Sequence, residues 1–192
     1  EFITKFPNDA RADEARIGLG WALFRLERLD EARATCAQKL GNVELEGERY
    51  FLAGLIERKS DRHKEAAKWL VPLATYSQPH KRSLEAKLIA GLSLAKCGQN
   101  DLAVRELSSY GSNPENEEDG ALALYELAFV YLAMKREADA DKSFVAITVK
   151  YPKSKFAADS AFRMGERFYL RNDWNSALRA YVFCVENSKD GE

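Results

Sequence analysis

The sequence predicts an all-α fold, a right-handed α-solenoid of about five helical hairpins. Two recurring features predict it. A small residue returns at intervals of 34, 37, 37 and 37 residues, and an alanine follows each one after twelve positions. Such self-similarity at a fixed period is the signature of stacked structural repeats. The small residues are Gly20, Gly54, Gly91, Ala128 and Gly165, and the alanines are Ala32, Ala66, Ala103, Ala140 and Ala177.

The first helix of each hairpin is predicted around the small residue. A segment such as ADEARIGLGWALFRL carries apolar residues at three- and four-residue steps, which places them on one stripe of a helix. The small residue in the middle allows a second helix to approach closely. The sequence therefore predicts one amphipathic helix per repeat, packed at its small residue.

The second helix of each hairpin is predicted to begin near the recurring alanine, as in LDEARATCAQ and WNSALRAYVFCV. A larger side chain at the alanine would push the paired helices apart. A medium or large apolar residue follows each alanine after four positions, one turn further along the same helix face. These residues are Cys36, Leu70, Leu107, Phe144 and Tyr181.

Short polar turns join the two helices, so each repeat is a hairpin that must stack on its neighbours to bury its apolar faces. The whole chain, 1–192, is predicted to be one array. Residues 1–10 are the end of a truncated repeat, and complete repeats span approximately 11–45, 46–80, 81–117, 118–154 and 155–192.

The segments between repeats resemble one another. Lys5-Phe6-Pro7 and Lys150-Tyr151-Pro152 occupy equivalent places, with the proline ending one helix before the next begins. The chain begins without a Met or a signal segment, and its final helix is apolar without a polar cap. We expect a fragment of a longer protein whose last helix is covered by further chain or by self-association.

Composition excludes several other classes. The 29 basic and 30 acidic residues leave a formal charge of -1, which does not favour a nucleic-acid partner. No apolar run approaches the roughly 20 residues that a membrane span requires. The cysteines are three and widely separated, so they are expected to be buried small apolar residues: Cys36, Cys97 and Cys184.

The pattern resembles the tetratricopeptide repeat (TPR), whose signature is W-x2-L-G-x2-Y, then A-x3-F, then P. The fourth repeat matches best, with Leu127-Ala128-x-x-Tyr131, then Ala140-x3-Phe144, then Pro152. The second repeat departs from the signature, with Glu57 at an aromatic position and Pro72 inside its second helix, where it should bend the chain. The resemblance covers nearly the whole chain and implies a protein-interaction scaffold.

A narrower resemblance concerns the linker Tyr151-Pro152-Lys153-Ser154 and the period of about 37 residues. Both are similar to TPR proteins of the bacterial envelope, of the outer-membrane assembly lipoprotein and Tol-Pal-associated types. Phe6-Pro7-Asn8-Asp9 departs at the serine. The resemblance implies a periplasmic or envelope-associated protein, with the cytoplasm as the alternative.

The partner-binding surface is predicted on the first helices, whose side chains line the concave face of a stack. A protein or peptide with hydrophobic anchors and some acidic character would suit the apolar, aromatic groove and its scattered cations. The same side chains could instead pack one first helix against the next. The candidate residues are Ile17, Trp21, Phe24, Arg25, Phe51, Leu55, Arg58, Leu88, Leu92, Tyr125, Phe129, Leu132, Phe162 and Tyr169.

No catalytic residue, cofactor or metal is predicted. The chain has no Gly-rich phosphate loop and no Gly-x-Ser-x-Gly, and His63 and His80 lie in different loops. The expected function is therefore a non-catalytic scaffold. The alternatives are a structural array that self-associates through its terminal helices, and an accessory domain of a larger enzyme or regulator.

Overall fold

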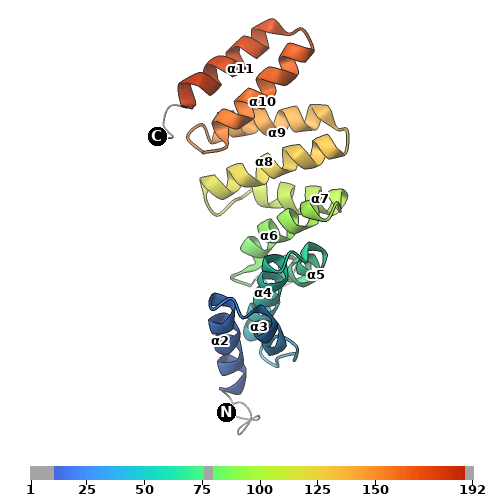
Figure 1. Cartoon of the computed structure of the whole chain (residues 1–192), viewed down its shortest axis with the longest axis vertical. Helices are drawn as coiled ribbons and strands as arrows, with labels where there is room; N and C mark the ends of the chain where they lie inside the picture. Colours follow the sequence, from blue (N-terminus) through green and yellow to red (C-terminus); the bar gives the residue numbers. More distant parts are fainter. Residues whose placement is uncertain (1–10, 76–79, 189–192) are drawn as a thin grey trace. The chain divides into compact units, whose positions relative to one another are not determined.

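A computed structural model describes residues 11–75 and 80–188, which form ten α-helices and no strand (Figure 1). The all-α prediction is confirmed. The helices are α2 (Ala12–Arg25), α3 (Leu29–Thr35), α4 (Val43–Lys59), α5 (His63–Ala74), α6 (Ser83–Lys96), α7 (Asn100–Gly111), α8 (Glu117–Ala133), α9 (Glu137–Lys150), α10 (Ala157–Leu170) and α11 (Trp174–Asn187).

The chain consists of two compact units, Glu1–Cys97 and Gly98–Glu192. In the first unit α2 packs on α3, α4 packs on α5, and α6 packs on α5. In the second unit α8 pairs with α9 and α10 with α11, while α7 packs on α8 (Figure 1). The predicted third repeat, 81–117, contributes α6 to one unit and α7 to the other, and the predicted truncated repeat, 1–10, lies outside the described residues.

The recurring alanines lie in the core, as the sequence predicts. Their exposed fractions range from 0% for the first four to 3% for Ala177. In the second and fifth hairpins the glycine of the first helix meets the apolar residue of the second helix. A Cβ built on Gly165 would lie 2.5 Å from Tyr181 Cε1, and one built on Gly54 would overlap the Leu70 side chain. Glycine is therefore required at these positions by the closeness of the paired helices.

Each hairpin turn contains one residue with a left-handed backbone, seven positions after the small residue. Four of these residues are not glycine: Glu27, Asp61, Lys135 and Asn172, with φ of 59–60°, and the fifth is Gly98 with φ 73°. In the first turn Arg28 N donates to Leu23 O and Glu27 N donates to Phe24 O. Equivalent pairs of hydrogen bonds follow at Asp61, Lys135 and Asn172 and satisfy the last carbonyls of the helix, so the same geometry closes these four hairpins.

A buried ion pair holds the connection between the first two hairpins. Arg49 Nε donates to Glu46 Oε2 at 2.8 Å, and Arg49 Nη1 donates to Cys36 O at 2.7 Å. Leu40 N also donates to Glu46 Oε2, at 2.9 Å. Burial by itself raises the pKa of Glu46, but these hydrogen bonds and the charge of Arg49 outweigh it, so the pKa lies below its ordinary 4.5.

The second repeat replaces its signature aromatic with a buried carboxylate. Glu57 is 6% exposed and accepts a hydrogen bond from Arg33 Nε of α3 at 2.9 Å. Arg33 also donates to Ser60 Oγ at 3.0 Å, so one guanidinium joins α3 to the end of α4. Helix α5 continues for two residues past Pro72 and ends at Ala74. The bend that Pro72 should cause stays a prediction.

The prediction that all three cysteines are buried is correct for one. Cys36 is 2% exposed, and burial raises the pKa of its thiol, whereas Cys97 and Cys184 are half-buried. Cys97 follows the last turn of α6, and Cys184 lies near the end of α11, where fewer neighbours cover it.

Glu46→Ala should destabilise the protein by about 3 kcal/mol, because it leaves the Arg49 charge buried without its partner. Glu65→Ala removes an exposed Glu–Lys pair of α5 and should change stability much less, because exposed ion pairs contribute little. Urea unfolding followed by circular dichroism measures both. Because the pKa of Glu46 is lowered in the folded protein, its contribution is present above pH 4.5 and is lost as the pH falls. A Glu46→Ala midpoint equal to that of Glu65→Ala at neutral pH would contradict the assignment.

Candidate functional site

A pocket of about 470 Å³ opens on the first unit. Its apolar lining is Trp21 and Phe24 of α2 with Phe51 and Leu55 of α4. Trp21 lies edge-on to Phe24, with ring centroids 6.0 Å apart, and is tilted against Phe51 at 6.3 Å. The charged lining residues are Arg25, Arg82 and Glu85. The sequence placed five of these seven residues in the predicted binding set.

A second pocket, of about 320 Å³, adjoins the first because both are lined by Phe24 and Leu55. Its other lining residues are Arg58, Lys59 and His63. We call the two pockets together the first-unit groove. Its apolar floor comes from the first helices of two successive hairpins, α2 and α4, as the repeat pattern requires.

The groove carries two cations that no carboxylate neutralises. Lys59 pairs with Glu27 at 2.8 Å, and Arg82 pairs with Glu85 at 2.9 Å. Arg25 and Arg58 are exposed and form no ion pair among the described residues. A ligand therefore meets an apolar floor beside an excess of positive charge, which favours an anionic group next to an apolar one.

Arg82 covers one end of the groove. Its guanidinium carbon lies 4.9 Å from the Phe51 ring centroid and 6.0 Å from that of Trp21, within the range of cation–π attraction. Its position just before α6 and its ion pair with Glu85 keep it over the rings. Sequence reasoning missed Arg82 and Glu85 because it considered only side chains between three residues before and five residues after the central small residue. Arg82 lies nine residues before Gly91.

The equivalent positions of the second unit are filled by its own side chains. Tyr125 corresponds to Phe51, and its ring lies 5.0 Å from Phe129 and 5.0 Å from Phe156. Its hydroxyl donates to Asp159, and burial with this hydrogen bond raises the pKa of Tyr125. Arg163 lies 4.7 Å above the Phe129 ring and pairs with Asp159 at 2.7 Å. Here the predicted binding residues belong to an aromatic core.

The remaining candidates lie in three settings. Ile17 and Leu88 are buried at 7% and 6% exposure, and Phe51 is only 1% exposed although it lines the pocket, so these three mainly pack helices together. Leu92 and Leu132 are half-buried. Phe162 and Tyr169 are exposed on α10, beside Tyr181 and Trp174 of α11. The site as a whole stays a prediction, and the structure brings only the first-unit residues together around a pocket.

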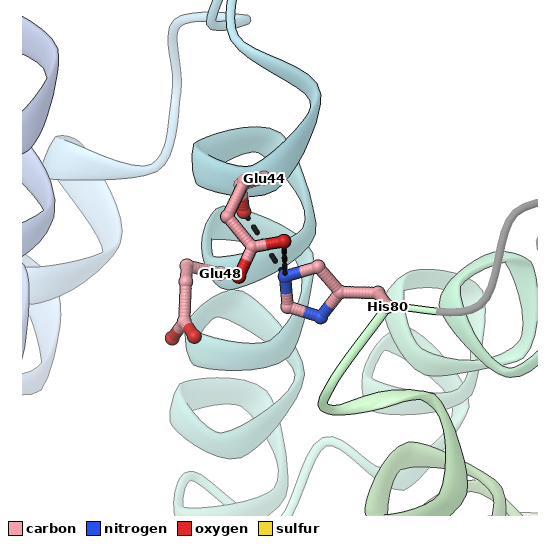
Figure 2. Close-up of side chains that lie close together, drawn as sticks. All are labelled: Glu44, Glu48 and His80. Carbon is pink, nitrogen blue, oxygen red and sulfur yellow. Dashed lines mark hydrogen bonds and ion pairs between the residues drawn. The ribbon is translucent and has the colours of Figure 1, made fainter.

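A cluster of Glu44, Glu48 and His80 lies where the segment before α6 meets α4 (Figure 2). Each residue offers one atom that could bind a metal, and these atoms lie within 4.8 Å of one another. His80 is buried, and its Nε2 lies 3.1 Å from Glu44 O and 3.2 Å from Glu44 Oε2. The Cβ of any residue other than glycine at position 47 would overlap the His80 ring.

The hydrogen bonds of His80 oppose metal binding. Arg82 N donates to His80 Nδ1 at 3.1 Å, so Nδ1 is the acceptor and the proton resides on Nε2, which donates to Glu44. A histidine binds a metal through a nitrogen without a proton. Lys81 Nζ also lies 3.0 Å from both carboxylates. The cluster is therefore an ionic bridge between α4 and the start of α6.

The tetratricopeptide-repeat family model matches residues 122–154, which cover most of α8 and all of α9. A comparison of the sequence with curated proteins gives no match. Within the described residues, no helix combines the length and apolar character needed to cross a membrane.

Several solved structures resemble the chain over most of its length. The crystal structure of MamA is 16% identical with a TM-score of 0.73, and the likeness covers 89% of this chain and 95% of that one. MamA from Desulfovibrio magneticus RS-1, residues 41 to the end, is 13% identical with a TM-score of 0.72, over 94% and 97%. YrrB, described as a TPR protein with an unusual peptide-binding site, is 20% identical with a TM-score of 0.70, over 98% and 91%.

The repeat register, the paired helices and the similar solved structures all indicate the same fold. The chain has the fold of tetratricopeptide-repeat proteins, and residues 122–154 contain a repeat of that family.

Proposed function

We propose that this chain is a non-catalytic protein-interaction module that binds a peptide segment of a partner in the first-unit groove. The peptide carries an apolar or aromatic anchor with an acidic residue beside it. The tetratricopeptide-repeat fold is consistent with protein–protein interaction, and the groove supplies the chemistry for this ligand.

The cations Arg25 and Arg58, which form no ion pair within residues 11–75 and 80–188, stand beside the apolar floor and carry the proposal. Large apolar side chains around a pocket offer an anchor site, because burying one such side chain contributes about 1.5–3 kcal/mol. Arg25 and Arg58 stand on different helices of the groove, so one peptide with two acidic residues can contact both. Such contacts raise the association rate and select against basic peptides.

YrrB, a TPR protein with a peptide-binding site, supports the ligand class. At 20% identity it supports the shared fold and says nothing about the particular residues. The lining of the groove in this chain is therefore argued from its own contacts.

The scaffold role needs no reacting group. The groove is lined by aromatic rings, aliphatic side chains, guanidinium groups, the Lys59 ammonium and the Glu85 carboxylate. Its histidine, His63, lies 3.0 Å from Asp61. The same module could serve as the accessory domain of a larger enzyme or regulator, with the groove recognising that protein's partner.

We also propose that the protein acts in the bacterial envelope, in the periplasm. The support is the resemblance of Tyr151-Pro152-Lys153-Ser154 to the linkers of envelope proteins. In this chain the linker has a structural role too, because Ser154 Oγ donates to Glu118 Oε2 of α8 at 2.8 Å. The alternative location is the cytoplasm.

A randomised peptide library displayed on phage should yield binders that combine an apolar anchor with acidic residues. Arg25→Glu and Arg58→Glu should each weaken a selected peptide about tenfold, and added salt should weaken the wild-type complex, because the contacts are electrostatic. Lys68→Glu, on the exposed surface of α5, is the matched control and should leave affinity unchanged. Fluorescence anisotropy measures the affinities. Selected peptides without acidic residues would refute the proposal. So would Arg25→Glu and Arg58→Glu proteins that both bind the selected peptide with wild-type affinity.

Leu55→Ala should weaken the same peptide while keeping the protein folded, because Leu55 is half-buried and lines both pockets. Phe129→Ala should destabilise the protein by about 2–3 kcal/mol, because its ring belongs to the second-unit core, and should leave peptide affinity intact under folding conditions. Circular dichroism and anisotropy on the two variants separate these effects. A Phe129→Ala protein that is stable but unable to bind would move the site to the second unit.

Location is tested with the full-length protein in its own organism. Fractionation of cells after osmotic shock should release the protein, or leave it with the envelope, while a cytoplasmic marker enzyme stays in the spheroplasts. Recovery with the cytoplasmic marker would refute the envelope assignment and would leave the peptide proposal untouched.

A further inference from the structure

Helix α11 exposes an apolar stripe that no other described segment covers. Trp174, Leu178, Val182 and Val185 have exposed fractions of 54%, 63%, 44% and 61%. At 3.6 residues per turn these four positions fall within about a quarter of the helix circumference. The opposite side of the helix carries Ala177 and Ala180, which are buried against α10. The stripe is thus a continuous apolar surface that extends over three turns of α11.

Two opposite charges border this stripe on the same edge. Arg179 and Glu186 are seven residues apart, which is about two helical turns, and both are exposed. Arg179 Nη2 donates to Ser176 Oγ at 3.0 Å. Within residues 11–75 and 80–188, neither Arg179 nor Glu186 forms an ion pair. Their midpoint lies beside Val182, at the centre of the stripe.

The arrangement is complementary to itself. When two such helices pair antiparallel about a two-fold axis near Val182, equal edges face each other and run in opposite directions. Arg179 of one copy then faces Glu186 of the other, and the reverse pair forms by symmetry. Leu178 of each copy lies near Val185 of its partner. In a parallel pairing about an axis along the helices, the charged edges of the two copies would lie on opposite sides of the contact, so neither Arg179–Glu186 pair would form.

Helix α9, the second helix of the preceding hairpin, carries different side chains at the positions equivalent to those of the α11 stripe. Asp141 of α9 corresponds to Leu178, and its carboxylate binds Arg167 and Arg171 of α10, the latter at 2.6 Å. Lys142 and Val149 of α9 stand where α11 has Arg179 and Glu186. Of these two helices, α11 therefore has the charge pair beside an exposed apolar stripe and α9 does not.

We propose that α11 is a homodimerisation surface, on which a second copy of this chain docks its own α11 antiparallel. The contact lies on the second unit and is independent of the first-unit groove. A contact between single helices is small for a stable interface, so the dissociation constant should be on the order of 10 μM.

Sedimentation equilibrium of the whole chain over about two decades of concentration tests the proposal. The wild type should shift from monomer to dimer. Arg179→Glu and Glu186→Arg should each weaken the dimer about tenfold, since each replaces two attractive contacts by two repulsive ones. Lys142→Glu, at the equivalent place on α9, is the matched control and should dimerise as the wild type does.

The charge reversals also give a rescue experiment. An equimolar mixture of the Arg179→Glu and Glu186→Arg proteins should form a heterodimer with near wild-type affinity, because both contacts are again between opposite charges. The double variant R179E/E186R should recover self-association. Circular dichroism checks that every variant is folded, and Leu178→Gln should abolish the dimer without unfolding the exposed helix face.

A wild type that stays monomeric over the whole range would overturn the proposal. A dimer that is indifferent to both reversals, or a mixture that fails to recover association, would overturn it as well. Arg25→Glu, in the groove, should leave dimerisation unchanged, and R179E should leave peptide binding unchanged. Failure of one proposal is thereby distinguished from failure of the other.

Discussion

The close approach of paired helices at a small residue is the constraint on which the rest of the structure depends. Where Gly54 faces Leu70 and Gly165 faces Tyr181, even one additional carbon would force the helices apart. The recurring alanines are buried beside these contacts. Since interiors are packed as tightly as organic crystals, this spacing sets the register of the turn, the second helix and the next hairpin. The left-handed residue seven positions after each small residue follows the same register.

The same register gives the two units different surfaces. At one pair of equivalent positions the first unit has Phe51 beside Arg82, whereas the second has Tyr125 beside Phe156. In the second unit the Phe156 ring packs on Tyr125 and fills the space beside it. In the first unit the Arg82 guanidinium lies over Phe51, where a pocket remains and carries its charge. The equivalent acidic residues also have different partners. Glu85 pairs with Arg82 in the first unit, whereas Asp159 accepts a hydrogen bond from the Tyr125 hydroxyl in the second. An aromatic groove in one unit and an aromatic core in the other thus follow from a few substitutions at fixed positions.

Buried ionic groups hold the segments between helices, where the apolar stripes give no support. Glu46 and Arg49 bind the backbone of the connection after α3, and His80 binds the backbone of α4. Each charge finds partners that compensate its loss of water, as a buried charge must. These contacts explain polar residues that look out of place in an amphipathic repeat, including the carboxylate of Glu57 at an aromatic position.

The sequence by itself determined the helix pairs, because the period of the small residues, the alanine twelve positions later and the turns are local and repeated. It also named Trp21, Phe24 and Leu55 as candidates, since helical periodicity tells which side chains share a face. Tertiary structure decided which candidates line a pocket. That depends on side chains from other elements, such as Arg82 over Phe51 or Phe156 over Tyr125. It also decided that His80 Nε2 donates to α4, because the tautomer depends on a backbone donor that no spacing of histidines predicts.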